Sequence, residues 1–209
     1  MSANPSKHKK QLALGIISVW LIATVIAFWW FQVKDLRPFD LQMSSQIEDQ
    51  SLALQLKQLV KDQDRNSPEH GYIINFWRPG CSCSRFNISH VKSLNAQYRK
   101  QGISVITLVP ASADYSNEHL TQMAEEKFAT PAIIVNDRLF SGASRIPAIP
   151  SAAILNRNGQ LHYFGPYNDG AFCGIGGTRF VEKVADLLIE DENPNIINTL
   201  SYGCYCSWT

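Results

Sequence analysis

The apolar positions of the chain follow three patterns, which predict a membrane helix, buried strands and amphipathic helices. One uncharged run covers residues 12–31, about the 20 residues that are needed to cross a bilayer. Short runs rich in β-branched and aromatic residues predict buried strands at 72–77, 103–109, 130–135, 151–155 and 161–164. Apolar residues at helical spacing predict helices over 44–61, 84–100, 117–128 and 178–190. Strands that alternate with helices in this way predict a parallel α/β core.

The N-terminal pattern predicts a retained membrane anchor. Residues 1–10 are polar and carry three lysines, which favour the cytoplasmic side, and Trp29 and Trp30 fit the aromatic belt at the far interface. A cleaved signal peptide is the alternative, but its apolar region would be shorter, and no small-x-small cleavage motif follows residue 31. We therefore expect a single pass through the inner (plasma) membrane, with the soluble part on the periplasmic or extracytoplasmic side.

The length of 209 residues accommodates one ordinary domain with additions. We predict a cytoplasmic N-terminus and transmembrane anchor over 1–34, and a tether with an amphipathic helix over 35–70. The α/β domain would cover 71–190, and residues 191–209 form a cysteine-containing segment that we call the C-terminal tail. The net charge is +1 and no long basic stripe is present, so the sequence gives no support to nucleic-acid binding.

Two cysteines follow the first predicted strand of this domain. The apolar run stops at Pro79-Gly80, and Cys81 and Cys83 come where the strand gives way to a helix. The unpaired N–H groups and the positive dipole end at the start of a helix favour a thiolate over a thiol. Such cysteines have a pKa below the ordinary value of about 8.5. Cys81 is therefore a candidate nucleophile near neutral pH.

The residues around these cysteines carry a family resemblance. Asn75-Phe76-Trp77, followed after three residues by Cys81, resembles the active-site segment of the thioredoxin-like superfamily. Asn before Phe-Trp is similar to the membrane-anchored, cytochrome-maturation branch. The resemblance implies a central sheet flanked by helices and an enzyme that exchanges disulfides with protein thiols in the cell envelope.

The motif departs from the family pattern at two positions. Gly80 stands where an aromatic residue commonly precedes the first cysteine, and Ser84 stands where the second cysteine would be, so the second thiol is Cys83. Side chains two residues apart diverge on a helix, and a Cys81–Cys83 disulfide would therefore be strained. Strained disulfides are more oxidising, which suits a disulfide donor or a labile switch.

A second segment extends the resemblance. Ile149-Pro150, followed by a strand and an Asn156–Gly159 turn, resembles the cis-proline segment of thioredoxin-like proteins. The likeness implies that Pro150 is cis and lies against Cys81, and that Ile149 offers its backbone groups to an extended substrate. The alternative is an ordinary trans proline that opens a strand, since only about 5–6% of X–Pro bonds are cis.

Three further cysteines lie near the C-terminus. Cys173 belongs to a glycine-rich loop over 165–177, and Cys204 and Cys206 repeat the Cys-x-Cys spacing in the C-terminal tail. This combination resembles an uncharacterised family of bacterial membrane-anchored proteins with a Gly-Cys-Tyr-Cys tail, which implies architecture and no mechanism. Five cysteines leave at least one that is free, bound to a partner or bound to a metal. We expect Cys173 within bridging range of the Cys81 motif.

These cysteines allow three hypotheses. In the favoured one, which needs no cofactor, Cys81 attacks, Cys83 or Cys173 resolves, and Cys204 and Cys206 pass electrons on or lock as a disulfide. In the second, Cys81 and Cys83 bind Cu(I), helped by Cys173, the tail cysteines or a histidine, with His162 and His90 as candidates. In the third, a Cys204–Cys206 or Cys173 disulfide holds the C-terminal tail on an inert scaffold.

Overall fold

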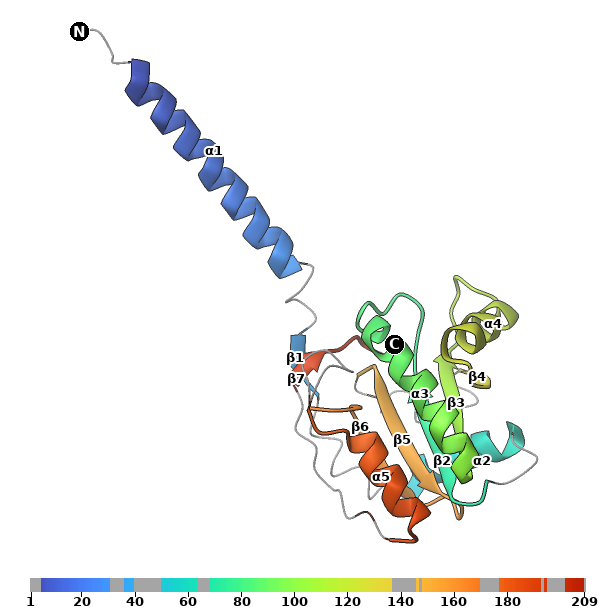
Figure 1. Ribbon diagram of the computed structural model, residues 1–209. Coiled ribbons are helices and arrows are strands. Elements are labelled where there is room, and N and C mark those ends of the chain that lie inside the picture. Colours follow the sequence, from blue (N-terminus) through green and yellow to red (C-terminus); the bar gives the residue numbers. More distant parts are fainter. Residues whose placement is uncertain are drawn as a thin grey trace. The chain divides into compact units, whose positions relative to one another are not determined.

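The computed structural model describes residues 5–30, 36–39, 50–63, 68–136, 146, 148–169, 177–192, 194 and 202–208 (Figure 1). The chain divides into two compact units, 1–36 and 37–209. The first contains α1 (Pro5–Phe28), whose stretch Lys9–Phe28 is 20 residues long, has a mean hydropathy of 2.2 and buries none of its side chains. This helix is long and apolar enough to cross a membrane, as the sequence pattern predicts.

The second unit is built on a five-stranded mixed sheet with the order β4-β3-β2-β5-β6. Its strands are β2 (Gly71–Phe76), β3 (Ile103–Pro110), β4 (Ala132–Val135), β5 (Ser151–Asn156) and β6 (Leu161–Gly165). The pairs β2–β3 and β3–β4 are parallel, whereas β5 runs antiparallel to β2 and to β6. All five strands lie where the sequence predicts them, and β5–β6 is the predicted hairpin. The prediction of a parallel core holds for β2, β3 and β4 and is wrong for β5, which runs antiparallel to β2.

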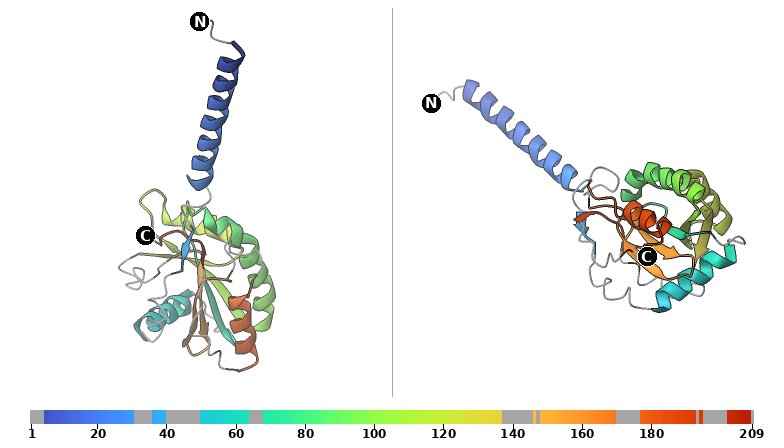
Figure 2. Two further views of the ribbon diagram at one scale, coloured as in Figure 1. Left: turned by 90° about the vertical axis from the view of Figure 1, so that its left-hand side faces the viewer. Right: turned by 60° about the horizontal axis from the view of Figure 1, so that its bottom comes forward.

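Helices cover both faces of this sheet. Figure 2 shows α3 (Ile88–Tyr98) and α5 (Phe180–Ile189) on one face and α2 (Gln50–Gln63) on the other. Buried side chains of α4 (Asn117–Phe128) join those of α3 and α5 in one core with the sheet. The predicted cap of α4 is present, since Ser116 Oγ accepts a hydrogen bond from His119 N at 3.3 Å. The arrangement is the predicted thioredoxin-like fold.

The alternation of side chains along the strands separates the two faces. Ile73, Trp77 and Tyr163 belong to the core under α3, α4 and α5, so the neighbouring Phe76 and Phe164 point to the opposite face. All five side chains are buried. Both faces of the sheet are therefore covered, which explains why its strands read as nearly continuous apolar runs.

The C-terminal tail contributes to the second unit. Its residues Tyr202–Cys204 form β7, which pairs with β1 (Leu36–Pro38) in a small two-stranded sheet. Tyr205 and Trp208 are each only 1% exposed. The sequence pattern separates this tail from the domain over 71–190, but its residues Tyr205 and Trp208 are buried in the second unit.

Candidate functional site

The Cys81 motif begins with a turn that follows β2. Gly80 has a φ of +79°, in the left-handed region that favours glycine, which explains why no aromatic residue precedes Cys81. Residues Cys83–Asn87 form a 3-10 helix, and α3 starts only at Ile88, later than the predicted residue 84. Serine and asparagine in this stretch have low helix propensity, which favours the later start. Cys81 thus precedes a 3-10 turn and does not stand at the first turn of α3.

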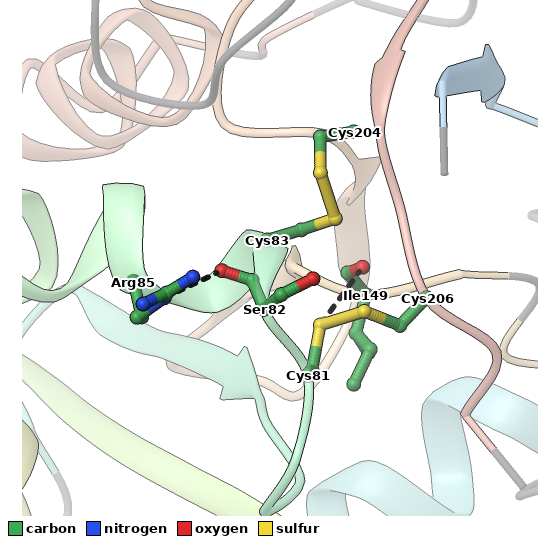
Figure 3. The surroundings of a disulfide bond; sticks show 7 residues. All are labelled: Cys81, Ser82, Cys83, Arg85, Ile149, Cys204 and Cys206. Carbon is green, nitrogen blue, oxygen red and sulfur yellow. Dashed lines mark hydrogen bonds between the residues drawn. A yellow bond between two sulfur atoms is a disulfide. The ribbon is translucent and has the colours of Figure 1, made fainter. Parts of the chain in front are cut away.

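Both cysteines of the motif form disulfides with the C-terminal tail (Figure 3). Cys81 is bonded to Cys206, with 5.9 Å between the Cα atoms, and Cys83 is bonded to Cys204, with 5.4 Å between them. The predicted alternatives of a Cys81–Cys83 or a Cys204–Cys206 disulfide are therefore wrong for this state. Cys173 lies outside the described residues.

The pairing follows from the conformation of the two Cys-x-Cys segments. The first cysteine of one segment joins the second cysteine of the other, so the segments face each other in antiparallel register. The C-terminal tail is extended here, and side chains two positions apart on an extended chain lie on the same side. Cys204 and Cys206 therefore both face the motif, while Tyr205 points away. This geometry avoids the strain of a disulfide inside either segment.

The peptide bond between Ile149 and Pro150 is cis, as the resemblance implies. Ile149 N donates to Cys206 O at 2.9 Å, and Cys206 N donates to Ile149 O at 2.8 Å. Cys81 Sγ lies 3.9 Å from Ile149 O (Figure 3). The backbone groups that were expected to receive an extended substrate are thus paired with the residue that is disulfide-bonded to Cys81.

The two disulfides differ in their access to solvent. Cys83 is completely buried and Cys204 is 7% exposed, so the Cys83–Cys204 bond is enclosed. Cys81 is 6% exposed, but Cys206 is only half-buried. The residues of the outer disulfide, Cys81–Cys206, are therefore more exposed than those of Cys83–Cys204.

Aromatic side chains hold the C-terminal tail beside the sulfur atoms. The Tyr205 ring meets Phe39 edge to face, with 5.4 Å between the ring centres. The Trp208 ring also meets the Phe76 ring edge to face, with 5.7 Å between the ring centres and an angle of 88° between the ring planes. Phe164 lies between these contacts, 6.3 Å from Phe39 and 5.6 Å from Phe76. Sequence reasoning noticed the aromatic residues of the tail but missed these partners, although the strand alternation places Phe76 and Phe164 on one face.

A chain of uncharged polar groups lies in the core below the motif. Asn75 Nδ2 donates to Thr107 Oγ1 at 3.1 Å, and Asn75 Oδ1 accepts from the Tyr167 hydroxyl at 2.7 Å. Thr107 Oγ1 lies 2.7 Å from Thr130 Oγ1. In soluble thioredoxins a buried acid commonly stands at the position of Asn75, as the resemblance implies. Asn75 carries an amide in place of this acid, and an amide does not take up a proton near neutral pH. Both its Nδ2 and its Oδ1 are hydrogen-bonded here.

The structure brings together three sulfur atoms that could hold a metal ion. The Sγ atoms of Cys81, Cys83 and Cys206 all lie within 4.8 Å of one another. The two candidate histidines are not members of this group. His162 contacts Asn156 at 3.0 Å near the β5–β6 turn, at the opposite end of β5 from Ile149. The structure therefore brings together the sulfur atoms of the motif and of the C-terminal tail, all of them disulfide-bonded here, and does not bring together the predicted set of Cys81, Cys83 and His162.

His90 belongs to a polar seam between α3 and α5. Its Nε2 lies 2.6 Å from Glu182 Oε1, and both side chains are largely buried. Burial alone would raise the pKa of the Glu182 carboxyl, but the hydrogen bond and the charge of His90 outweigh it and lower that pKa. In the same seam the Tyr98 hydroxyl donates to Asp186 Oδ1 at 2.7 Å. Burial and this hydrogen bond raise the pKa of Tyr98.

Comparison with solved structures confirms the fold. An uncharacterised conserved protein from Geobacillus kaustophilus is 21% identical, with a TM-score of 0.57 over 68% of this chain and 79% of that chain. A hypothetical protein from Sinorhizobium meliloti is 17% identical, with a TM-score of 0.56 over 69% of this chain and 82% of that chain. A thioredoxin-like protein in its oxidized form is 19% identical, with a TM-score of 0.46 over 61% and 82%.

Sequence comparison adds one finding. Residues 48–208 match a family model described as a domain of unknown function, DUF6436. This range includes the Cys81 motif, the Ile149–Pro150 segment and both cysteines of the C-terminal tail. No curated protein matches the sequence.

Proposed function

The chain belongs to the DUF6436 family, and we propose that it is a membrane-anchored thiol–disulfide oxidoreductase that acts on protein thiols in the cell envelope. One observation carries the proposal. Cys81 is disulfide-bonded to an extended segment whose cysteine residue makes two backbone hydrogen bonds with Ile149, next to cis-Pro150. This arrangement has the form of an enzyme bound to a substrate through a mixed disulfide.

The reaction starts from the reduced site. The Cys81 thiolate attacks a disulfide of the substrate protein, forms a mixed disulfide and releases one substrate sulfur as a thiolate. The Cys206 thiolate then attacks Cys81 Sγ, which forms the Cys81–Cys206 disulfide and releases the second substrate sulfur. The substrate disulfide is reduced to two thiols, and two cysteines of the enzyme are oxidised. The same steps in reverse oxidise a dithiol substrate.

The pairing in this structure supports Cys206 as the resolving residue in place of Cys83. Cys83 is completely buried and bonded to Cys204, so its sulfur is occupied while the outer bond exchanges. The Cys83–Cys204 bond would hold the C-terminal tail near Cys81 after the outer bond opens. A tethered thiol acts at an effective concentration in the millimolar range, which makes resolution fast.

A trapping experiment tests this assignment. The reduced full-length chain, purified in detergent, is mixed with a disulfide-bonded test protein, quenched with acid and mapped by mass spectrometry. We expect Cys206→Ser to accumulate a mixed disulfide on Cys81, because the resolving thiol is missing. Cys81→Ser should form no adduct, whereas Cys83→Ser/Cys206→Ser should still form it on Cys81. An adduct on Cys83 or Cys204, or normal exchange by Cys81→Ser, would contradict the proposal.

The membrane location rests on α1 and on the predicted orientation of its lysines. If α1 is an anchor, the mature protein keeps residues 1–31 and stays with the membrane fraction after an alkaline wash. The intact mass of the protein purified from membranes measures this directly. A mature protein that lacks these residues would show that α1 is a cleaved signal, and the proposed anchor would be wrong.

Binding of Cu(I) is a second candidate function, favoured by the three sulfur atoms within 4.8 Å. Paired thiolates are soft ligands that suit Cu(I), and these would become available after reduction of both disulfides. We expect the reduced chain to bind less than one equivalent of copper if exchange is its function. One equivalent that is retained on dialysis and lost in Cys81→Ala would favour the copper function.

A further inference from the structure

We propose that residues 205–208 of the C-terminal tail occupy the binding site of the substrate, so that Tyr-Cys-Ser-Trp displays the sequence that the site selects. The inference rests on the proposed function and adds the class of substrate. That class is an extended segment with a cysteine, an aromatic residue immediately before it and a second aromatic residue two positions after it.

The backbone contacts of this site are independent of sequence. Ile149 offers one N–H and one C=O, and both are paired with the backbone of Cys206. Any extended segment can make the same two hydrogen bonds through the residue that carries its cysteine. These two backbone hydrogen bonds therefore set the position of the sulfur relative to Cys81. The choice of substrate depends on the neighbouring side chains.

The first selective contact is the one made by Tyr205. Because the chain is extended, this side chain points away from the sulfur atoms and contacts Phe39, whose ring in turn lies 6.3 Å from that of Phe164. The residue is 1% exposed and its ring meets Phe39 edge to face. An aromatic residue before the reactive cysteine would make the same ring contact with Phe39, whereas a small residue would lose it.

The second selective contact is the one made by Trp208. Its ring stands perpendicular to that of Phe76 and is also 1% exposed. The indole Nε1 is buried and has no hydrogen-bond acceptor among the described residues. A buried donor without an acceptor weakens binding. The site therefore selects the aromatic ring and not the indole N–H, and phenylalanine should serve at least as well as tryptophan.

Peptides test this selectivity. Three peptides are prepared with the cysteine capped by glutathione: Gly-Tyr-Cys-Ser-Trp-Gly, Gly-Tyr-Cys-Ser-Phe-Gly and Gly-Ala-Cys-Ser-Ala-Gly. Each is added to the reduced full-length Cys206→Ser chain, in which the resolving thiol is absent. Cys81 attacks the peptide sulfur, the peptide–Cys81 disulfide forms, and glutathione leaves as a thiolate. Rates are normalised to the attack of a free small thiol on the same peptides.

We expect the two aromatic peptides to react at least about tenfold faster than the alanine peptide, because each ring contact adds to binding. The phenylalanine peptide should match or exceed the tryptophan peptide. Equal normalised rates for all three peptides would overturn the inference and leave the proposed function intact. Failure of every peptide to form an adduct on Cys81 would instead remove the proposed function itself.

A variant of the C-terminal tail tests whether tail and substrate share one site. In the reduced Cys206→Ser chain, Tyr205→Ala should speed the reaction with the aromatic peptides several-fold, because the tail competes less well for the contact with Phe39. Tyr202→Ala is the matched control, since Tyr202 is 57% exposed and should not change the rate. Circular dichroism and thermal unfolding check the fold of both variants. An unchanged or slower reaction of a folded Tyr205→Ala chain would overturn the inference.

Discussion

The two faces of the central sheet are closed in different ways. On one face, α3, α4 and α5 pack against the strands through a core of apolar side chains and a few hydrogen-bonded polar groups. On the other, α2 covers part of the sheet, and the C-terminal tail lies over Phe76 and Phe164 and is joined to the domain by two disulfides. Packing on the first face does not depend on the redox state, whereas the attachment of the tail does.

This difference gives the proposed chemistry a physical basis. A disulfide can be exchanged by any thiol that reaches it, and the Cys81–Cys206 bond is the more accessible of the two. Exchange at this bond would therefore free Cys206, while Cys83–Cys204 still holds the C-terminal tail and the face under α3, α4 and α5 stays folded. Changes at the C-terminal tail should therefore have larger effects than changes under α3, α4 and α5.

The largest effect should come from removing both disulfides. They join residues 125 and 121 positions apart, and in the loop-entropy model closing such a loop stabilises the folded state by about 4–5 kcal/mol. We expect Cys204→Ser/Cys206→Ser to lose a free energy of unfolding of that order in urea. Cys81→Ser/Cys206→Ser should lose much less, because Cys83–Cys204 still closes nearly the same loop. Equal losses in both variants would contradict this account.

A smaller effect is expected at the chain of uncharged polar groups in the core under α3, α4 and α5. Asn75→Leu removes the acceptor of the Tyr167 hydroxyl and the donor to Thr107, which should cost about 1–3 kcal/mol of unfolding free energy. The loss should be the same in the oxidised and the reduced chain, since this face does not depend on the disulfides. Gln122→Leu, which removes an exposed hydrogen bond to Glu126, is the matched control. A loss that disappears on reduction would show that the faces are coupled.

The smallest effect concerns the His90–Glu182 pair. The pKa of Glu182 is lower in the folded chain than its ordinary value of 4.5. The pair therefore stabilises the fold above about pH 4.5. This stabilisation is lost as the pH falls through the pKa that the Glu182 carboxyl has in the folded chain. We expect Glu182→Gln to flatten the acid limb of the stability curve by less than about 1 kcal/mol. An acid limb that is as steep in the variant would show that the pair contributes nothing.

Much of the fold could be predicted because its signals are local. The strands are buried on both faces and read as apolar runs, and Ser116 marks the start of α4. The cis geometry of Pro150 followed from the family resemblance of its segment. The start of α3 was predicted too early, because a 3-10 turn satisfies the same apolar spacing.

The candidate site could be predicted only in part. The pattern identified Cys81 and the Ile149–Pro150 segment, but the pairing with Cys204 and Cys206 depends on a tail that returns over more than 100 residues. The repeated Cys-x-Cys spacing was the available signal, since it matches an antiparallel register of two segments. The prediction that His162 helps to bind copper is not supported, because His162 lies near the β5–β6 turn, far along the strand from the cysteines. The residue type alone does not indicate which end of the hairpin it occupies.

The central claim is that Cys81–Cys206 is the bond that exchanges, while Cys83–Cys204 holds the C-terminal tail in reach. It is tested by adding a small thiol to the oxidised full-length chain, alkylating the freed cysteines at intervals and mapping them by mass spectrometry. The account predicts that Cys81 and Cys206 become alkylated roughly a hundredfold sooner than Cys83 and Cys204, because the inner bond must first be uncovered by local unfolding. Simultaneous opening of both bonds, or earlier opening of Cys83–Cys204, would contradict it.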